Sequence, residues 1–165
     1  MDNKHFRFII SVIGYVVDDD GNVLLSRHPK RGWEVPGGAI EFGEDGVSAL
    51  VREVQEETGY TVAVNGFVGM YFDLDDETLV LQFRCQPNGS GPRKVVGSEE
   101  ARWFLPEEAR RLVSAEPARS RLLDALAEDG RVAFRGFRSN PYSLLRSEVW
   151  IPEPSAMKPD SETIG

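Results

Sequence analysis

Apolar positions in the first half of the chain follow the pattern of β-strands. Residues 6–17 are rich in Ile, Val and aromatic side chains, residues 18–22 supply turn-forming Asp, Gly and Asn, and apolar residues resume at Val23. Such runs separated by turn residues are typical of a β-hairpin. Two later runs, at 61–72 and 77–86, are separated by a short acidic stretch and predict a second hairpin.

Residues 45–58 show a helical rather than a strand period. The apolar residues of this segment fall on one side of a helical wheel, a face that can pack on a sheet: Val47, Leu50, Val51, Val54 and Thr58. Gly59 follows directly, as expected for the residue that caps the end of a helix. Further helices are expected at 106–114 and 119–128, and short strands at 33–35 and 101–105.

The order of these elements predicts the fold class. Strands stand before and after one helix without regular alternation, which indicates an α+β or α/β protein with a mixed sheet. A chain of 165 residues fits one domain, which we expect over residues 1–150. Residues 151–165 contain Pro, Ser and acidic residues without an apolar period, and predict a flexible tail.

Composition and charge narrow the possible partners. The net charge of -8 counts against binding to a polyanionic backbone, so a nucleic-acid partner is not expected. The most apolar stretch, residues 8–17, is about half as long as a membrane span, and we expect no membrane partner. Cys85 is the single cysteine, so we expect a small core residue and a cytoplasmic protein without disulfides.

An unusual cluster of carboxylates occupies the end of the predicted 45–58 helix. Glu53 and Glu57 are one turn apart and Glu56 lies beside them, where the helix terminus already carries partial negative charge. Carboxylates in this position must splay into water, take up a proton or bind a cation. Oxygen ligands without His or Cys favour Mg²⁺, Mn²⁺ or Ca²⁺ over zinc. On charge pattern alone, a solvated helix face is the simpler interpretation.

These acids belong to a longer string of fixed spacing. Gly38 is followed after five residues by Glu44 and after seven more by residues 52–60, which read REVQEETGY. This string resembles the Nudix box at every fixed position, with Tyr60 where an aliphatic residue is commoner. Its flanks also resemble those of a MutT-like Nudix hydrolase domain, so that the resemblance covers about residues 6–115.

The resemblance implies both a fold and a reaction. The fold would be a Nudix-type α/β/α sandwich with a mixed β-sheet and a catalytic loop-helix-loop. The reaction would be hydrolysis of a pyrophosphate bond, with Mg²⁺ or Mn²⁺, in a nucleoside diphosphate linked to another group. By elimination, we expect a nucleoside triphosphate or a related small nucleotide as the substrate. The alternative is a catalytically silent Nudix-fold domain that binds or senses a nucleotide. Family members are often dimers, so a homodimer is considered as well.

Positions in the box imply roles for individual residues. Glu53 and Glu57 are the expected principal metal ligands, Glu56 would ligate directly or through water, and the Gly38 carbonyl would be another ligand. Arg52 would orient a neighbouring glutamate. The candidates for the group that takes the proton are Glu56 in the box and, in the later loop, Glu99 or Glu100.

The remaining candidates have structural or substrate-binding roles. We expect Gly37 to allow close approach of the backbone, Glu44 to hold the loop by hydrogen bonding and Gly59 to close the helix. Arg27 could reach a substrate phosphate, although an ordinary exposed arginine explains it equally well. Aromatic residues, among them Trp33 and Phe72, could stack on a base, although a place in the core is the commoner role for such residues.

Overall fold

The computed structural model describes residues 7–89, 91 and 100–152, and its strands form two sheets. The larger sheet has six strands in the order β4 (Gly37–Ala39), β1 (Ile9–Val16), β6 (Thr78–Pro87), β5 (Val62–Asp73), β8 (Val132–Ser139) and β9 (Tyr142–Trp150). The smaller sheet has the order β3 (Gly32–Glu34), β2 (Val23–His28) and β7 (Ala101–Phe104). β1 runs parallel to β6 and β5 parallel to β8, whereas the other pairs are antiparallel, so the larger sheet is mixed as the sequence predicts.

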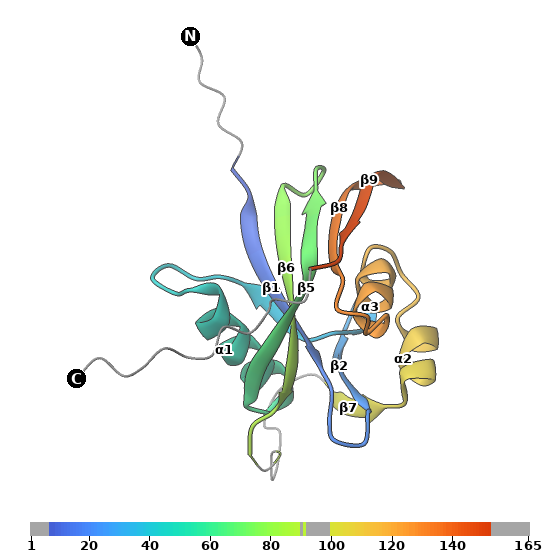
Figure 1. The fold of residues 1–165 in the computed structure, drawn as a ribbon. Helices are drawn as coiled ribbons and strands as arrows, with labels where there is room; N and C mark the ends of the chain where they lie inside the picture. The colour runs from blue at the N-terminus through green and yellow to red at the C-terminus, as the bar shows by residue number, and fades with distance from the viewer. Residues whose placement is uncertain (1–6, 90, 92–99, 153–165) are drawn as a thin grey trace, which may run out of the picture.

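In the described residues, helices lie on both sides of the larger sheet. α1 (Gly46–Thr58) lies on one side, and α2 (Pro106–Leu112) and α3 (Ala118–Leu126) lie on the other, where α2 packs on the smaller sheet (Figure 1). This is the predicted α/β/α sandwich. One hydrophobic cluster fills the α1 side and includes Leu50, Val54 and the buried Cys85. A second cluster fills the side of α2 and α3 and includes Tyr71 and Leu122.

The predicted first hairpin is wrong. β1 and β2 belong to different sheets and are joined only by a bridge between Val17 and Val23. Both edges of β1 are occupied, by β4 and β6, so β2 has no edge of β1 on which to pair. The turn itself forms as expected, because Asp18 Oδ1 accepts hydrogen bonds from the backbone N–H groups of Asp20 (3.0 Å) and Asn22 (2.8 Å).

Local signals predict the other elements better. β5 and β6 form the expected hairpin, α2 and α3 stand at the expected positions, and β7 matches the strand expected at 101–105. β4 was not predicted: Gly37 and Gly38, expected in a loop, pair with β1. All but two residues of the predicted tail, those from 153 onward, lie outside the described residues.

α1 begins and ends where its capping residues require. The Asp45 side chain accepts hydrogen bonds from the N–H groups of Val47 (2.9 Å) and Ser48 (3.0 Å), and Gly59 ends the helix at a φ of 75°. The predicted apolar face is correct except for Val47, which is 47% exposed at the first turn. The caps and the buried face together fix the direction in which the later turns of α1 present their glutamates.

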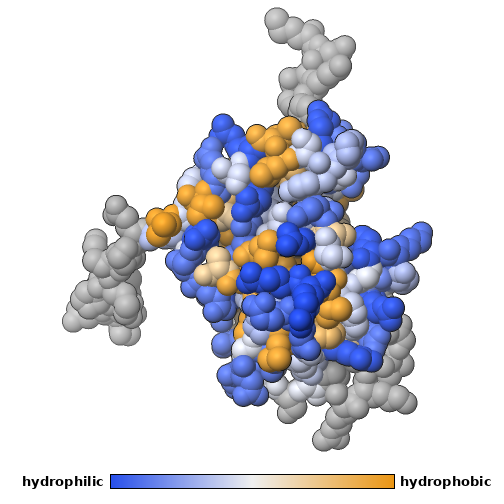
Figure 2. Space-filling view, turned by 90° about the vertical axis from the view of Figure 1, so that its right-hand side faces the viewer, coloured by the Kyte–Doolittle hydropathy of each residue, from blue (hydrophilic) through white to orange (hydrophobic). Residues whose placement is uncertain are grey.

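The surface on the side of α2 and α3 is of mixed polarity (Figure 2). Figure 2 views the molecule from the side of α2 and α3, where apolar patches are separated by hydrophilic side chains. Within the described part of the chain, no helix is long and apolar enough to cross a membrane.

Candidate functional site

Glu57 is fixed by groups from two sheets. Its Oε2 accepts a hydrogen bond from Ser26 Oγ (3.0 Å) in β2 and another from the Gly37 N–H (3.1 Å) in β4. Burial raises the pKa of Glu57 to about 7, even though both hydrogen bonds favour the ionised form. The sequence did not indicate Ser26, whose side chain is buried and 31 positions from Glu57.

The two glycines of β4 allow the backbone to approach its neighbours unusually closely. A Cβ atom at Gly37 would lie 2.1 Å from the Val12 carbonyl oxygen, and one at Gly38 would lie 2.5 Å from the Glu53 carboxyl group. Any larger residue would therefore displace β1 or the Glu53 side chain. Glu53 and Glu57 both meet the same dipeptide, so two of the predicted ligands converge on one stretch of backbone.

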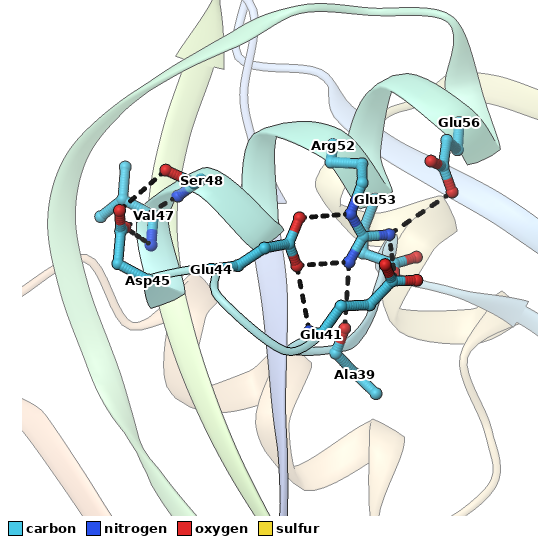
Figure 3. A network of polar contacts seen from close by, with 9 residues as sticks. All are labelled: Ala39, Glu41, Glu44, Asp45, Val47, Ser48, Arg52, Glu53 and Glu56. Atoms are coloured by element: carbon cyan, nitrogen blue, oxygen red, sulfur yellow. Dashed lines mark hydrogen bonds and ion pairs between the residues drawn. The ribbon is translucent and has the colours of Figure 1, made fainter.

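Arg52 is the centre of a polar network on α1 (Figure 3). Its guanidinium binds Glu44 through two hydrogen bonds of 2.7 and 2.8 Å, donates to Glu53 (2.8 Å) and lies 3.5 Å from Glu56. Arg52 also donates to the Ala39 carbonyl (3.2 Å), which connects α1 to β4. The hydrogen bonds from Arg52 hold the pKa of Glu44 at about 2. Arg52 thus contacts three of the predicted acids at once.

Glu44 also closes the loop before α1. Its carboxylate accepts a hydrogen bond from the Glu41 N–H (3.0 Å), three residues earlier. Because the same carboxylate binds Arg52 on the helix, the loop is tied to the second turn of α1. This geometry supports the loop-holding role expected for Glu44.

The donor set fits a hard divalent cation. In the described ranges, no group of three or more His, Cys, Asp or Glu side chains already converges as a metal site. Arg52 is the partner of Glu53 and Glu56 here, while Glu57 accepts its two hydrogen bonds. All of these donors are oxygen atoms, which Mg²⁺ and Mn²⁺ prefer as ligands. Gly38 allows the backbone of β4 to lie against the Glu53 carboxylate.

Glu100 directly precedes β7 and lies beside Arg27 of β2. It pairs with Arg27 across an Oε2 to Nη1 distance of 3.3 Å, and it also contacts Arg102. The Arg27 N–H donates to the Glu100 carbonyl, so β2 and β7 place Glu100 one position from the residue that holds Glu57. Glu99, the other acid expected in this loop, lies outside the described residues.

Trp33 and Phe72, the two aromatic residues considered for base stacking, have different surroundings. Trp33 packs edge-on against Phe104 at a centroid distance of 4.8 Å, next to the core on the side of α2 and α3. Phe72 contacts Phe8 and Phe134 in an aromatic cluster that contains none of the predicted catalytic residues. A substrate contact remains a prediction for both.

A charged cavity next to the two glycines was not predicted. It has a volume of about 380 Å³, lies on the side of α3 and reaches the backbone of Gly37 and Gly38. Its ionisable lining residues are Arg31, Glu34, Asp73, Asp76 and Arg121. These residues come from widely separated segments, so no spacing in the sequence brings them together.

Comparisons with known proteins agree with this architecture. The sequence matches the NUDIX domain over residues 7–126. It is 40% identical over 118 residues to a MutT-like protein of Streptomyces ambofaciens, covering 71% of this chain and 76% of that protein. It is 30% identical over 123 residues to a CTP pyrophosphohydrolase of Escherichia coli K12, covering 71% and 90% respectively. The solved mutator MutT protein of Bacillus halodurans has a TM-score of 0.66 and 26% identity, covering 89% of this chain and all of that one.

Proposed function

Because the chain belongs to the Nudix hydrolase family, we propose that its α1 site binds Mg²⁺ or Mn²⁺ and hydrolyses a pyrophosphate bond in a nucleoside diphosphate linked to another group. The observation that carries this proposal is the convergence of Glu53 and Glu57 on the Gly37–Gly38 backbone. Two acids from successive turns of one helix, held against one glycine pair, provide oxygen donors from both helix and strand.

The residues that would hold the cation are Glu53, Glu56, Glu57 and the Gly38 carbonyl. A bound divalent cation supplies charge neutralisation at phosphate oxygens and lowers the pKa of water. Ser26 and Gly37 keep the Glu57 carboxylate in one orientation, and Glu44 keeps Arg52 beside Glu53. The chain itself therefore positions the acids before any ligand arrives.

Glu56 is the better candidate for the group that takes the proton. It is exposed and has one long contact, to Arg52 at 3.5 Å. Glu100 already contacts two guanidinium groups, those of Arg27 and Arg102. These contacts engage both carboxylate oxygens of Glu100, whereas the Glu56 carboxylate has more freedom to reach a water molecule.

The substrate we propose is a nucleoside triphosphate or a related small nucleotide. The name of the E. coli relative, a CTP pyrophosphohydrolase, supports this class. We expect a cytoplasmic enzyme that acts on small phosphorylated compounds, without a membrane or nucleic-acid partner. A homodimer remains a prediction.

A substrate panel tests this proposal directly. The protein is incubated with the four common nucleoside triphosphates and Mg²⁺, and the products are identified by mass spectrometry. We expect a nucleoside monophosphate and pyrophosphate, or a diphosphate and phosphate, from at least one of them. Nucleotide binding without any product over a long incubation would favour the catalytically silent alternative.

A further inference from the structure

Among the described residues, Arg121 has no hydrogen-bond or ion-pair partner for its side chain, and it lines a cavity that contains several charged residues. Its Nε atom is buried and has no hydrogen-bond partner, and in the described parts of the chain no ion pair involves Arg121. The side chain lines the 380 Å³ cavity beside Gly37 and Gly38 and also an adjoining one of about 360 Å³. A buried donor without an acceptor is costly, so it calls for a functional explanation.

The obvious partner of Arg121 is already engaged. Asp124 lies three residues further along α3, a spacing at which an arginine and an aspartate normally pair. Asp124 instead binds Arg135, with Arg135 Nε at 2.6 Å from Oδ2, and accepts a hydrogen bond from the Tyr71 hydroxyl (3.1 Å). Burial lowers the pKa of Arg121, which shows that nearby acids do not compensate for its desolvation.

The same cavity contains an available acceptor. Asp73 Oδ1 accepts hydrogen bonds from the backbone N–H groups of Asp75 and Asp76 and from Ser139 Oγ. No hydrogen bond from the described residues reaches Asp73 Oδ2, although Asp73 lines the cavity. Arg121 and Asp73 therefore offer an unused donor and an unused acceptor in one cavity.

The charge of the cavity disfavours a phosphate there. Its lining combines two arginines with three carboxylates, and Arg31 is already bound to Glu34 at 2.6 and 3.1 Å. A lining with one excess negative charge would repel a polyphosphate, whereas a neutral group with both donors and acceptors suits it. A nucleobase is such a group, and a cavity of this volume accommodates one beside the glycines at which the phosphates would lie.

We propose that Arg121 is a specificity-determining residue that donates hydrogen bonds to a carbonyl group of the substrate base, while Asp73 accepts from a base N–H. This inference rests on the proposed hydrolysis of nucleotides. Guanine, cytosine and uracil each carry a carbonyl acceptor and an N–H donor. Adenine has no carbonyl group, and its amino group would place a donor against the Arg121 donor. The cavity therefore selects carbonyl-bearing bases and rejects adenine.

The test replaces Arg121 by Met, which keeps the length of the side chain and removes its charge. In the wild type, kcat/KM for the best of GTP, CTP and UTP should exceed that for ATP by at least about tenfold, because a donor built to meet a substrate acceptor rejects an analogue that lacks it. The three carbonyl-bearing nucleotides distinguish which base is preferred. Arg121→Met should bring the ratio close to one, mainly through KM. Arg119→Met is the matched control, since Arg119 is exposed on the same helix and lines neither cavity.

A stability measurement separates recognition from a structural role. Because Arg121 is desolvated without a partner, Arg121→Met should keep or raise the Tm while it removes base discrimination. A lower Tm with equal losses for all four nucleotides would overturn the inference, as would an unchanged ratio in the variant or a wild type that does not disfavour ATP.

The experiments distinguish failure of this inference from failure of the proposed function. If the wild type releases no product from any nucleotide, equilibrium binding of the same four nucleotides with Mg²⁺ replaces turnover as the readout. Weaker binding of ATP in the wild type, lost in Arg121→Met, would still support the assignment of Arg121. Equal affinities in both proteins would overturn it. If hydrolysis is observed but Arg121→Met leaves discrimination intact, the inference fails and the proposed function stands.

Discussion

Arg52 and Arg121 lie on opposite sides of the same sheet and differ in how their charges are satisfied. Arg52 contacts three carboxylates from the loop and helix that contain it, and a backbone carbonyl of β4. Arg121 has a buried Nε without an acceptor, because the acid nearest on its helix binds Arg135. On the α1 side, one guanidinium is shared by three carboxylates, so the donor groups of Arg52 are engaged and negative charge remains in excess. The α3 side retains an unsatisfied donor that only a ligand or solvent can meet.

Removal of one charge on the α1 side should have the largest effect. We expect Glu57→Gln to lower kcat by at least about a thousandfold, as is usual when a group central to catalysis is removed. The substitution removes a charge and little volume, so circular dichroism should show a folded protein. Glu107→Gln, at an exposed position on α2, should leave kcat unchanged. Equal activity of Glu57→Gln and the wild type would show that the α1 acids are not the site.

On the α3 side, removal of the ion-paired Asp124 should lower the stability of the fold rather than the rate of catalysis. Asp124→Ala leaves Arg135 without its buried partner, and we expect a loss of about 3 kcal/mol in the free energy of unfolding. Urea titration measures this loss. The exposed pair of Arg146 and Glu148 provides the comparison, because its disruption should cost less than about 1 kcal/mol. A similarly small cost at Asp124 would mean that the buried pair does not hold α3 on the sheet.

The geometry of the Arg52 contacts should matter as much as the charge. Arg52→Lys keeps the positive charge but cannot bind Glu44 through two donors while it reaches Glu53. We expect kcat/KM to fall about tenfold, the lower end of what loss of an orienting residue costs. Arg110→Lys, on the exposed side of α2, serves as the control in the same assay. No change in Arg52→Lys would show that charge alone is sufficient.

The smallest effect that we expect is on the stability of the fold at acidic pH. The pKa of Glu44 is lowered from 4.5 to about 2 in the folded protein, so its pairing with Arg52 stabilises the fold above about pH 4.5. That contribution is lost as the pH falls toward 2. Thermal melts of wild type and Glu44→Gln should therefore differ at pH 6 and converge as the pH falls through about 2. A difference at about pH 2 as large as that at pH 6 would contradict this assignment.

The difference between the α1 and α3 sides also explains which features could be predicted from the sequence. Asp45 and Gly59 cap α1 through local contacts, and the spacing from Glu44 to Arg52 lies within one loop and one helix, so a linear pattern contains this information. The prediction of the first hairpin was wrong because β1 pairs with β4 and β6, which both come later in the chain than β2. The α3 cavity was missed for the same reason, since Asp73 and Arg121 meet only after the sheet and α3 have packed.

The sequence pattern also did not predict the burial and hydrogen bonding of individual side chains. The helical wheel placed Val47 on the buried face, but Val47 is exposed, whereas Ala49 in the same turn is fully buried. Ser26 has no feature that marks it in the sequence, and its role as a donor to Glu57 depends on how β2 lies beside α1. Positions set by one element are predictable, whereas contacts between elements require the fold.

The anomalous scattering of manganese tests the central claim most directly. Crystals of the wild type grown with Mn²⁺ and a non-hydrolysable nucleoside triphosphate would be measured at the manganese absorption edge. We predict a peak between Gly38 and the carboxylates of Glu53 and Glu57. A nucleotide bound without a manganese peak there would contradict the account.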